Sequence, residues 1–472
     1  MHSAQSRAHG YRATIVRKTT FGASMRRATA LVLPWVIPAA VSAQQSAAAP
    51  ALVFDGVTVV DVEQGKLVPD QRVIIVGNRI QTMGSTGAVK MPNGAQAVDA
   101  RGKYLIPGLW DLHTHRGYTP EREAAVIDYI IPLANGVTGI RDAYSNYVPL
   151  DSQVVWWREI LAGTRVGPPR QLLAGSVINQ LSEAEIADLK ARGANFLKLY
   201  PFEPEIAAAA RRSGLMYGGH VHGGSAIEAS DSGMVILDHL NTAGDLAERC
   251  LGPQASIELC QPVAERFKVN NSWFAPTLIT FAAIGGNWTE GIPGADDVAS
   301  RLHDLSRRFW ADSIGHGNWL RATASATSPT GSTTDSTSYF HILRKVGMPI
   351  LAATDADGTK GQLVSKLKGF ALHAELAIFV LAGSTQLEAL QAATINPAKM
   401  LRGTDSLGTV APGKLADLVL LDADPLADIT NTTMIRAVVA NGRYFDRAAL
   451  DSLLAEVRVA RAKEVQSEEE GP

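Results

Sequence analysis

The chain has 472 residues, 46% of them hydrophobic and 19% charged, which is enough apolar material for a large packed core. Its 44 basic and 46 acidic residues nearly cancel, giving a formal net charge of -2. This balance excludes a general electrostatic reason to expect nucleic acid or an anionic membrane as a partner. The function must therefore be inferred from a site.

The first 43 residues have the pattern of a signal peptide. A basic Met-Arg-Arg at 25–27 precedes an apolar run at 28–41, and the small residues at 41–43 suit a cleavage point. The apolar run is short for a bilayer span and contains two prolines, so we expect no membrane span after processing. The polar residues before Met25 leave open that translation begins at Met25. We expect an exported protein, periplasmic or secreted.

The chain contains two cysteines, Cys250 and Cys260, which lie ten residues apart. An oxidising compartment would allow a disulfide between them. Spacing alone does not establish that their Cα atoms lie close enough, so two free thiols are the alternative.

Two separated segments have the character of short strands joined by tight turns. One covers 51–106 and the other 401–447, and we predict that together they form one small β-sandwich. The acidic end of the chain, 464–472, is predicted to be disordered.

Between these segments, from 107 to 400, strand-like runs alternate with helix-like ones. This alternation indicates the α/β class and favours a (β/α)₈ TIM barrel. The clearest strand-like runs are 136–141, 194–200, 216–220, 235–239 and 349–355.

Histidines and one aspartate follow several of these runs. His113 and His115 end an apolar run, and alternate residues of a strand point to one face. His220, His239 and Asp355 end later runs, where barrel enzymes assemble their sites. Imidazoles and a carboxylate on one rim suit a borderline cation such as zinc.

Lys198 lies between Leu197 and Leu199 in a strand-like run, so its side chain is predicted to face the barrel interior. A buried lysine is costly unless it is paired or neutralised. It forms either a salt bridge at the barrel mouth or an N-carboxylate, made with carbon dioxide, that bridges two cations.

As an ordered set, these motifs resemble the amidohydrolase superfamily, and in particular its prolidase-like and imidazolonepropionase-related branch. Described members of that branch hydrolyse peptide-like or other amide bonds. The resemblance extends from Val53 to about Leu450, and the set is specific although each motif alone is not. Its parts are 106–112 before His113 and His115, Lys198, 219–221, 237–239, 352–355, 392–397 and 407–421.

The resemblance implies two divalent metal ions, for which zinc is suited. It implies that His113, His115 and Asp355 hold the more buried ion. His220 and His239 would hold the second ion, and carboxylated Lys198 would bridge both. A metal-bridging hydroxide would attack the substrate carbonyl, with Asp355 as general base and then acid.

Three further residues are candidates for substrate contact. His222 shares the side of His220 and could replace it as ligand; we expect a substrate or oxyanion contact, with packing as the alternative. Tyr200 shares a face with Lys198 and contacts substrate or packs. Arg141 either clamps a substrate carboxylate or pairs with a neighbouring acid. His341 and His373 are predicted to be structural or surface histidines.

The predicted activity is hydrolysis of amide C–N bonds in small peptide-like or N-acyl amino acid substrates. A lactonase or ester hydrolase could use the same centre. A mononuclear heterocycle deaminase would need no bridging lysine, and a non-catalytic binding protein would need no complete ligand set. A homo-oligomer is compatible with the sequence, but no feature sets its size.

Overall fold

The structure is a computed structural model, and its described residues belong to one compact unit that begins at Ala49. The predicted signal peptide at 1–43, with Met25, lies outside the described residues. His303 and His316, which follow no strand-like run and are also predicted to be structural or surface histidines, lie outside the described residues too. The described ranges are 50–115, 129–144, 148–174, 177–178, 181–251, 254–280, 334–356 and 369–469.

Strands from both ends of the described chain form one eight-stranded sheet. Its order is β16-β15-β14-β5-β1-β2-β3, and β4 pairs in parallel with β1. Its strands are β1 (Leu52–Asp61), β2 (Lys66–Val76), β3 (Arg79–Ser85), β4 (Gln96–Asp99), β5 (Tyr104–Pro107), β14 (Leu418–Leu421), β15 (Ile435–Ala440) and β16 (Arg443–Asp446).

A single hydrogen-bonded sheet replaces the two separate sheets that a sandwich would have. Register shifts in β1 between Phe54 and Val59 mark bulges, which bend a strand and increase its twist. One apolar core, with Phe54, Ile75 and Leu418 among its members, lies against the bent sheet. The bend lets one sheet enclose a core without a second sheet.

The middle of the chain contains two parallel sheets. The first has the order β6-β7-β8 and the second β13-β12-β11-β10-β9. Their strands are β6 (Leu109–His115), β7 (Val137–Tyr144), β8 (Arg170–Leu173), β9 (Val177–Ile178), β10 (Phe196–Leu199), β11 (Met216–Gly219), β12 (Ile236–Asp238) and β13 (Trp273–Ala275).

Backbone hydrogen bonds join these sheets at both sides. At one side, Asn195 N donates to Leu173 O (3.2 Å), which links β10 to β8. At the other, the extended segment 349–356 lies between β13 and β6, where Leu351 N donates to Phe274 O (2.9 Å). Leu112 N of β6 donates to Ala352 O (3.1 Å). The two parallel sheets and the segment 349–356 are therefore hydrogen-bonded to one another in a continuous series, within a mixed α/β structure.

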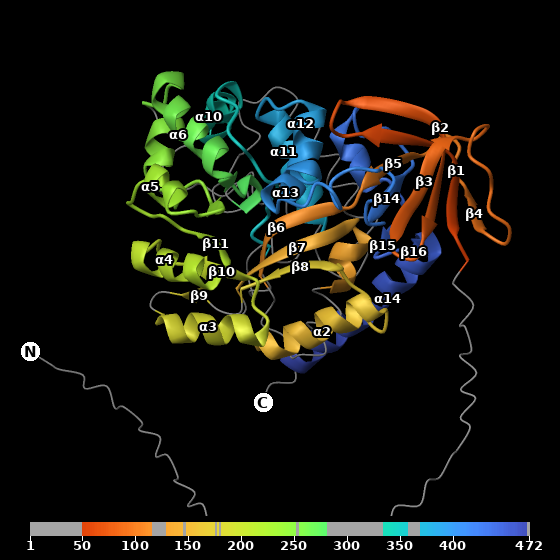
Figure 1. Ribbon diagram of the computed structural model, residues 1–472, viewed down its shortest axis with the longest axis horizontal. Coiled ribbons are helices and arrows are strands. Elements are labelled where there is room, and N and C mark those ends of the chain that lie inside the picture. The colour runs from red at the N-terminus through yellow and green to blue at the C-terminus, as the bar shows by residue number, and fades with distance from the viewer. Residues whose placement is uncertain are drawn as a thin grey trace, which may run out of the picture. The chain divides into compact units, whose positions relative to one another are not determined.

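Helices alternate with the parallel strands. Capping boxes at Ser182 and Thr385 begin α3 and α12. In Figure 1 the strands β1 to β4 lie at one end of this unit and α5 and α6 at the other. The helices are α2 (Leu150–Ala162), α3 (Glu183–Arg192), α4 (Pro204–Ser213), α5 (Ala226–Asp231), the π-helix η1 (Ala247–Leu251), α6 (Ile257–Asn270), α10 (Thr334–Lys345), α11 (Phe370–Leu381), α12 (Gln386–Ala392), α13 (Ile395–Met400), the 3-10 helix η3 (Ile429–Thr433) and α14 (Arg447–Glu469).

The end of the chain differs from the prediction of disorder. Helix α14 continues to Glu469, so 464–469 are helical, and only 470–472 lie outside the described residues. Its last two turns are rich in glutamate, lysine and glutamine, which are good helix formers even where the composition is acidic. None of the described helices is long and apolar enough to cross a membrane.

Cys250 in η1 and Cys260 in α6 are joined by a disulfide, with their Cα atoms 4.9 Å apart. Both residues are buried. The disulfide thus ties the turn before α6 to the body of that helix.

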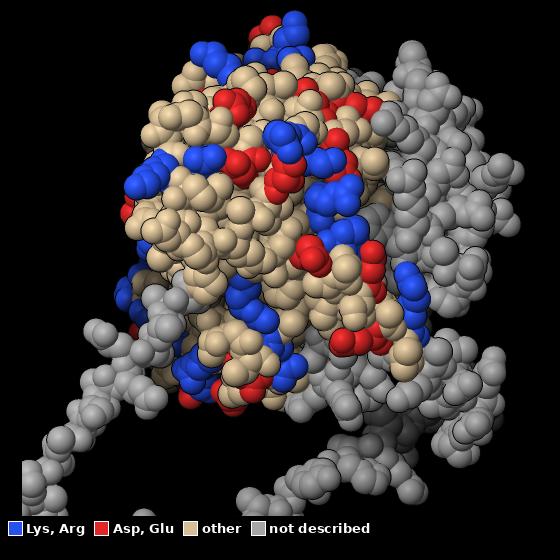
Figure 2. Space-filling model, turned by 90° about the vertical axis from the view of Figure 1, so that its right-hand side faces the viewer, with Lys and Arg blue, Asp and Glu red and all other residues tan. Residues whose placement is uncertain are grey.

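Both charge signs are spread over the surface. On the face shown in Figure 2, lysine and arginine side chains alternate with aspartate and glutamate. Neither sign forms one continuous patch on the described part of that face.

Candidate metal centre

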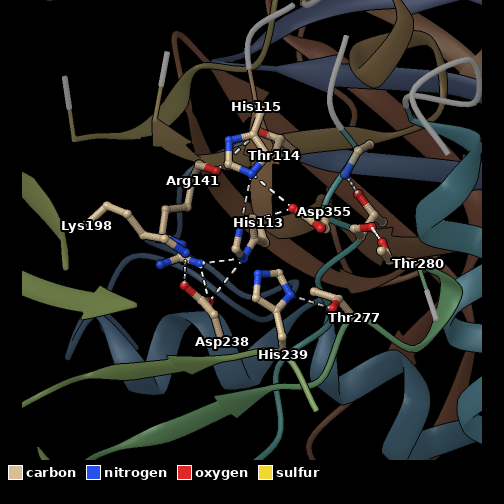
Figure 3. A network of polar contacts seen from close by, with 12 residues as sticks. His113, Thr114, His115, Arg141, Lys198, Asp238, His239, Thr277, Thr280 and Asp355 are labelled. Atoms are coloured by element: carbon tan, nitrogen blue, oxygen red, sulfur yellow. Dashed lines mark hydrogen bonds and ion pairs between the residues drawn. The ribbon is translucent and has the colours of Figure 1, made fainter. Parts of the chain in front are cut away.

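Three ligand-type atoms meet at the carboxyl end of β6. The Nε2 atoms of His113 and His115 lie 3.1 Å apart, and His115 Nε2 lies 2.9 Å from Asp355 Oδ1. His113 Nε2 lies 3.3 Å from the same oxygen. Three donors around a tetrahedral cation with bonds of about 2.0–2.1 Å would be roughly 3.3 Å apart, so the spacing suits such a cation. Figure 3 shows these side chains converging.

Asp355 is held in place by the backbone of β6. Its N–H donates to His113 O (2.8 Å), and the next residue accepts at Ala356 O from His115 N (3.0 Å). Asp355 has a φ of 54°, in the left-handed region that non-glycine residues seldom adopt. Strained backbone of this kind is found at functional sites, where the surrounding contacts enforce it.

His239 is the next member of the cluster. One ligand atom from each of His113, His239 and Asp355 lies within 4.8 Å of the others. His239 Nδ1 lies 2.8 Å from the hydroxyl of Thr277, which leaves Nε2 as the nitrogen that can bind a cation. His239 and Thr277 also have positive φ angles, 63° and 52°.

His220, His222 and Tyr200 form a second group of rings beside His239. The His220 ring lies 4.8 Å from that of His239, 5.3 Å from that of His222 and 4.4 Å from that of Tyr200, between centroids. Nδ1 of His220 is buried and has no hydrogen-bond partner among the described residues. Tyr200 is 41% exposed and His222 is half-buried, so these two side chains are nearer the solvent.

Lys198 forms an ion pair, which is one of the two alternatives predicted for it. Its Nζ donates to Asp238 Oδ2 at 2.5 Å, and the Lys198 side chain is 2% exposed. The other oxygen of Asp238 accepts from Arg141 Nη2 (2.5 Å) and lies 3.1 Å from His113 Nδ1. One buried carboxylate therefore joins side chains from β6, β7 and β10 (Figure 3).

Arg141 is not a substrate clamp in this structure, which corrects the prediction of a substrate contact. Its side chain is fully buried, donates through Nε to Leu112 O (2.5 Å), and lies over the ring of Phe196 at 5.1 Å. Its Nη2 pairs with Asp238 beneath the histidines, so the alternative of an acid pair applies, while its Nη1 is buried without a hydrogen-bond partner among the described residues. Of the two histidines that were predicted to be structural or at the surface, His341 is exposed and His373 is buried.

Asp238 is the site residue that sequence reasoning missed. Alternation along a strand would place Asp238 and His239 on opposite faces, so only one was assigned to the site. The left-handed φ of His239 ends the strand and turns this side chain back toward the cluster. The available signal was an acidic residue, Asp238, that follows two apolar strand residues and directly precedes His239.

Burial keeps the histidines neutral. Burial first, with the charge of Lys198 second, lowers the pKa of His113 well below its ordinary value and that of His220 to about 2. Burial also lowers the pKa of His239 to about 4, although Asp355 opposes it. A neutral imidazole offers a lone pair, so these residues can bind a cation at neutral pH.

The carboxylates stay ionised. Burial alone would raise the pKa of Asp355, but the nearby His113 and His115 outweigh it and lower that pKa. For Asp238, Arg141 and Lys198 likewise outweigh burial and hold the pKa well below its usual range. Burial lowers the pKa of Lys198 to about 8, although Asp238 opposes this shift. The cluster thus combines anionic oxygens, neutral imidazoles and the ammonium group of Lys198.

Comparison with known proteins gives one family match and relatives of two kinds. The model described as Amidohydrolase family matches residues 337–444. Over 414 residues the chain is 26% identical to the imidazolonepropionase of Anaeromyxobacter sp. (strain K), covering 81% of this chain and 92% of that protein. It is 41% identical to adenine deaminase 3 of Rhizobium meliloti (strain 1021) over 56 residues, 12% of this chain and only 9% of that protein.

The fold has close counterparts among solved structures. A Xaa-Pro dipeptidase with methionine bound in its active site aligns with a TM-score of 0.59 and 19% identity. The alignment covers 84% of this chain and 100% of that chain.

The described part of the chain therefore combines a mixed α/β fold with a cluster of His113, His239 and Asp355 that could hold a metal ion. The chain is thus similar to the Amidohydrolase family over residues 337–444, and its fold is similar to those of solved hydrolases, among them the Xaa-Pro dipeptidase.

Proposed function

We propose that the protein is a binuclear metal-dependent hydrolase of amide C–N bonds in small peptide-like or N-acyl amino acid substrates. The observation that carries this proposal is the spacing of 2.9–3.3 Å among His113 Nε2, His115 Nε2 and Asp355 Oδ1. The family match and the relatives support a hydrolytic enzyme that acts on C–N bonds.

We also propose that the two parallel sheets are the halves of one (β/α)₈ barrel. The inner apolar cluster supports this, because barrel interiors are packed in layers from alternate strands. Trp110 of β6, Leu172 of β8, Phe196 of β10 and Ile236 of β12 belong to one such cluster. Segment 349–356, which hydrogen-bonds to β13 and β6, would be the last strand.

The donor set fits two divalent cations. His113, His115 and Asp355 would hold one, and zinc matches their tetrahedral spacing. His239 and His220 would hold the second cation. Nδ1 of His220 is buried without a hydrogen-bond partner among the described residues, and this cation would place a charged group near it. Lys198 Nζ donates to Asp238, and an N-carboxylate formed on Lys198 would supply an anionic ligand for both cations.

The chain's own groups can then carry out amide hydrolysis. Divalent cations held by these residues would supply a water molecule of lowered pKa and a polarised carbonyl group. The carboxylate of Asp355 can accept the proton from the attacking water and return it to the leaving nitrogen as the C–N bond breaks. His222 and Tyr200, at the more exposed side of the cluster, can donate hydrogen bonds to the substrate oxygen.

Two other activities remain as alternatives. A mononuclear deaminase of heterocycles is favoured by the local likeness to adenine deaminase 3, although it covers only 56 residues. A lactonase or esterase could use the same centre. Burial of Lys198 among the predicted ligands favours the binuclear reading, because a single-metal site needs no bridging anion.

The test compares bound metal in wild type and in Lys198→Ala, with Lys268→Ala as the matched control. Lys268 is part-buried and donates to Val346 O, away from the predicted ligands. We expect about two equivalents in wild type and in the control but well below this in Lys198→Ala, with turnover of dipeptides or N-acyl amino acids lost. One equivalent in all three proteins, with turnover of adenine, would instead support the deaminase.

We further propose that the protein is exported after removal of residues 1–43. The disulfide between Cys250 and Cys260 supports this, because such bonds persist in oxidising compartments. Amino-terminal sequencing of the protein from a periplasmic or culture fraction should begin close to Gln44. A product that begins at Met1 or Met25 would contradict export by this route.

A further inference from the structure

We propose that Asp238 is a positioning residue that selects the metal-binding tautomer of His113 and at the same time anchors Lys198. This inference rests on the proposed function, because His113 and Lys198 are predicted ligands there. Asp238 itself is assigned to no ligand set.

The first step concerns the two partners of His113. Its Nδ1 atom lies 3.1 Å from Asp238 Oδ1, which only accepts, and 3.1 Å from Arg141 Nη2, which only donates. A neutral imidazole carries one proton. If the carboxylate is the partner, the proton is on Nδ1; if the guanidinium is the partner, the proton is on Nε2.

The second step concerns the other side of the ring. His113 Nε2 faces His115 Nε2 at 3.1 Å and Asp355 Oδ1 at 3.3 Å, which is where the cation would lie. A proton on Nε2 blocks that position. Only the tautomer chosen by Asp238 leaves the lone pair where a cation can use it, as is usual for metal-binding histidines backed by a carboxylate.

The third step concerns the strength of the arrangement. The side chains of His113, Asp238 and Arg141 are fully buried, so water does not compete for these bonds. Arg141 Nη2 is already held by Asp238 at 2.5 Å, which draws the guanidinium toward the carboxylate. Asp238 therefore both accepts the ring proton and restrains the competing donor.

The remaining oxygen of Asp238 gives it a second task. Oδ2 accepts from Lys198 Nζ at 2.5 Å, so one carboxylate orients residues assigned to both proposed cations (Figure 3). Loss of Asp238 is thus expected to weaken both cation positions, unlike loss of a group that touches only one ligand.

The first experiment measures the tautomer in metal-free wild type. The ¹⁵N chemical shifts of the imidazole nitrogens report which of them carries the proton, and His113→Gln identifies the signal. We expect a neutral ring protonated on Nδ1. A ring protonated on Nε2 would overturn the proposal, and this measurement does not depend on how any Asp238 variant folds.

The second experiment titrates Co²⁺ into metal-free wild type, Asp238→Asn, and Asp238→Asn with Arg141→Met, following the visible spectrum. Asp417→Asn is the matched control, since Asp417 is a nearly buried carboxylate paired with Arg170 at 2.7 Å. We expect affinity to fall by about 10–100-fold in Asp238→Asn, to stay within about twofold in the control, and to recover partly when Arg141 is removed as well.

The outcomes separate the two proposals. Wild type that binds no Co²⁺ would sink the proposed metal centre, while the tautomer of His113 would still be measurable. Wild-type affinity and spectrum in a folded Asp238→Asn would overturn the role of Asp238 alone. A loss without any recovery on removal of Arg141 would show that the competition between the two partners is not the cause.

Discussion

At the scale of single residues, the site depends on backbone conformations that side-chain patterns do not reveal. His222, His239, Thr277 and Asp355 all have positive φ angles between 52° and 63°. For Thr277, which is β-branched, this conformation is a clear outlier. Four such residues around one cluster indicate that contacts hold the backbone in place to aim these side chains.

Thr277 offers a residue-scale prediction. Its hydroxyl lies 2.8 Å from His239 Nδ1, so Thr277→Val should remove the bond that orients this ring while keeping the side-chain shape. We expect metal affinity to fall by about 10–100-fold at one of two positions, measured by calorimetric titration with Zn²⁺.

The matched control is Thr433→Val, because the hydroxyl of Thr433 donates only within its own 3-10 turn. The proposed geometry would be contradicted if Thr277→Val bound both equivalents with wild-type affinity, or if the control lost metal to the same extent.

At the scale of elements, the strand ends and the helices behind them are tied by buried polar groups. Gly219 must be glycine: a Cβ there would overlap the carbonyl oxygen of Leu199, so it lets β11 approach β10 just before His220. Behind β13, Glu375 of α11 accepts from the N–H groups of Leu278 (2.9 Å) and Ile279 (2.6 Å). These contacts fix the turn that begins at Thr277.

His373 of α11 gives an element-scale prediction on pH. It lies 2.9 Å from the Thr432 hydroxyl of η3 and 3.1 Å from Asn135 O, and burial lowers its pKa from 6.5 to about 4. Between these pH values the unfolded chain binds a proton that the folded chain does not. The contribution of His373 to stability is therefore complete above pH 6.5 and is lost as pH falls toward 4.

A shift of this size corresponds to about 3 kcal/mol. Denaturant unfolding at several pH values should show His373→Gln losing less stability than wild type between pH 6.5 and 4. Parallel curves for the two proteins would show that the ring is already protonated when folded.

At the scale of the whole molecule, the eight-stranded sheet, which contains the first and last described strands, contacts the parallel strands that carry the site. β5 pairs with β14, and Arg170 of β8 forms an ion pair with Asp417 at 2.7 Å. One apolar core includes Ile106, Ile131 and Val419, from three distant parts of the chain. The eight-stranded sheet and the parallel strands therefore share this core, in addition to the smaller core that lies against the eight-stranded sheet alone.

This shared core predicts a single cooperative unfolding transition. Calorimetry and tryptophan fluorescence should give coincident midpoints for the metal-free protein. Metal at about one hundred times its dissociation constant should stabilise the whole molecule by about 2.7 kcal/mol. Two separate transitions, or a metal effect on only one probe, would show that the eight-stranded sheet unfolds independently.

The local order of residues was sufficient to predict parallel strands and the histidines that follow them. His113 and His115 could be placed together because alternation along a strand is a local rule. The segment 401–447 was predicted as short strands joined by tight turns, and β15 and β16 form such a hairpin: Asn441 and Gly442 between them have φ angles of 50° and 79°, as a tight turn of this type requires.

What the sequence by itself determined was the kinds of side chain at the ends of successive strands, and thus the chemistry available to a metal. Only the tertiary structure decided their partners. Asp238 meets Arg141 across 97 positions of the chain, and Asp111 meets Thr354 across 243. Pairing at such separation depends on how strands are arranged and where the backbone turns, and neither follows from local periodicity. For that reason Arg141 was expected at the substrate and lies instead beneath His113.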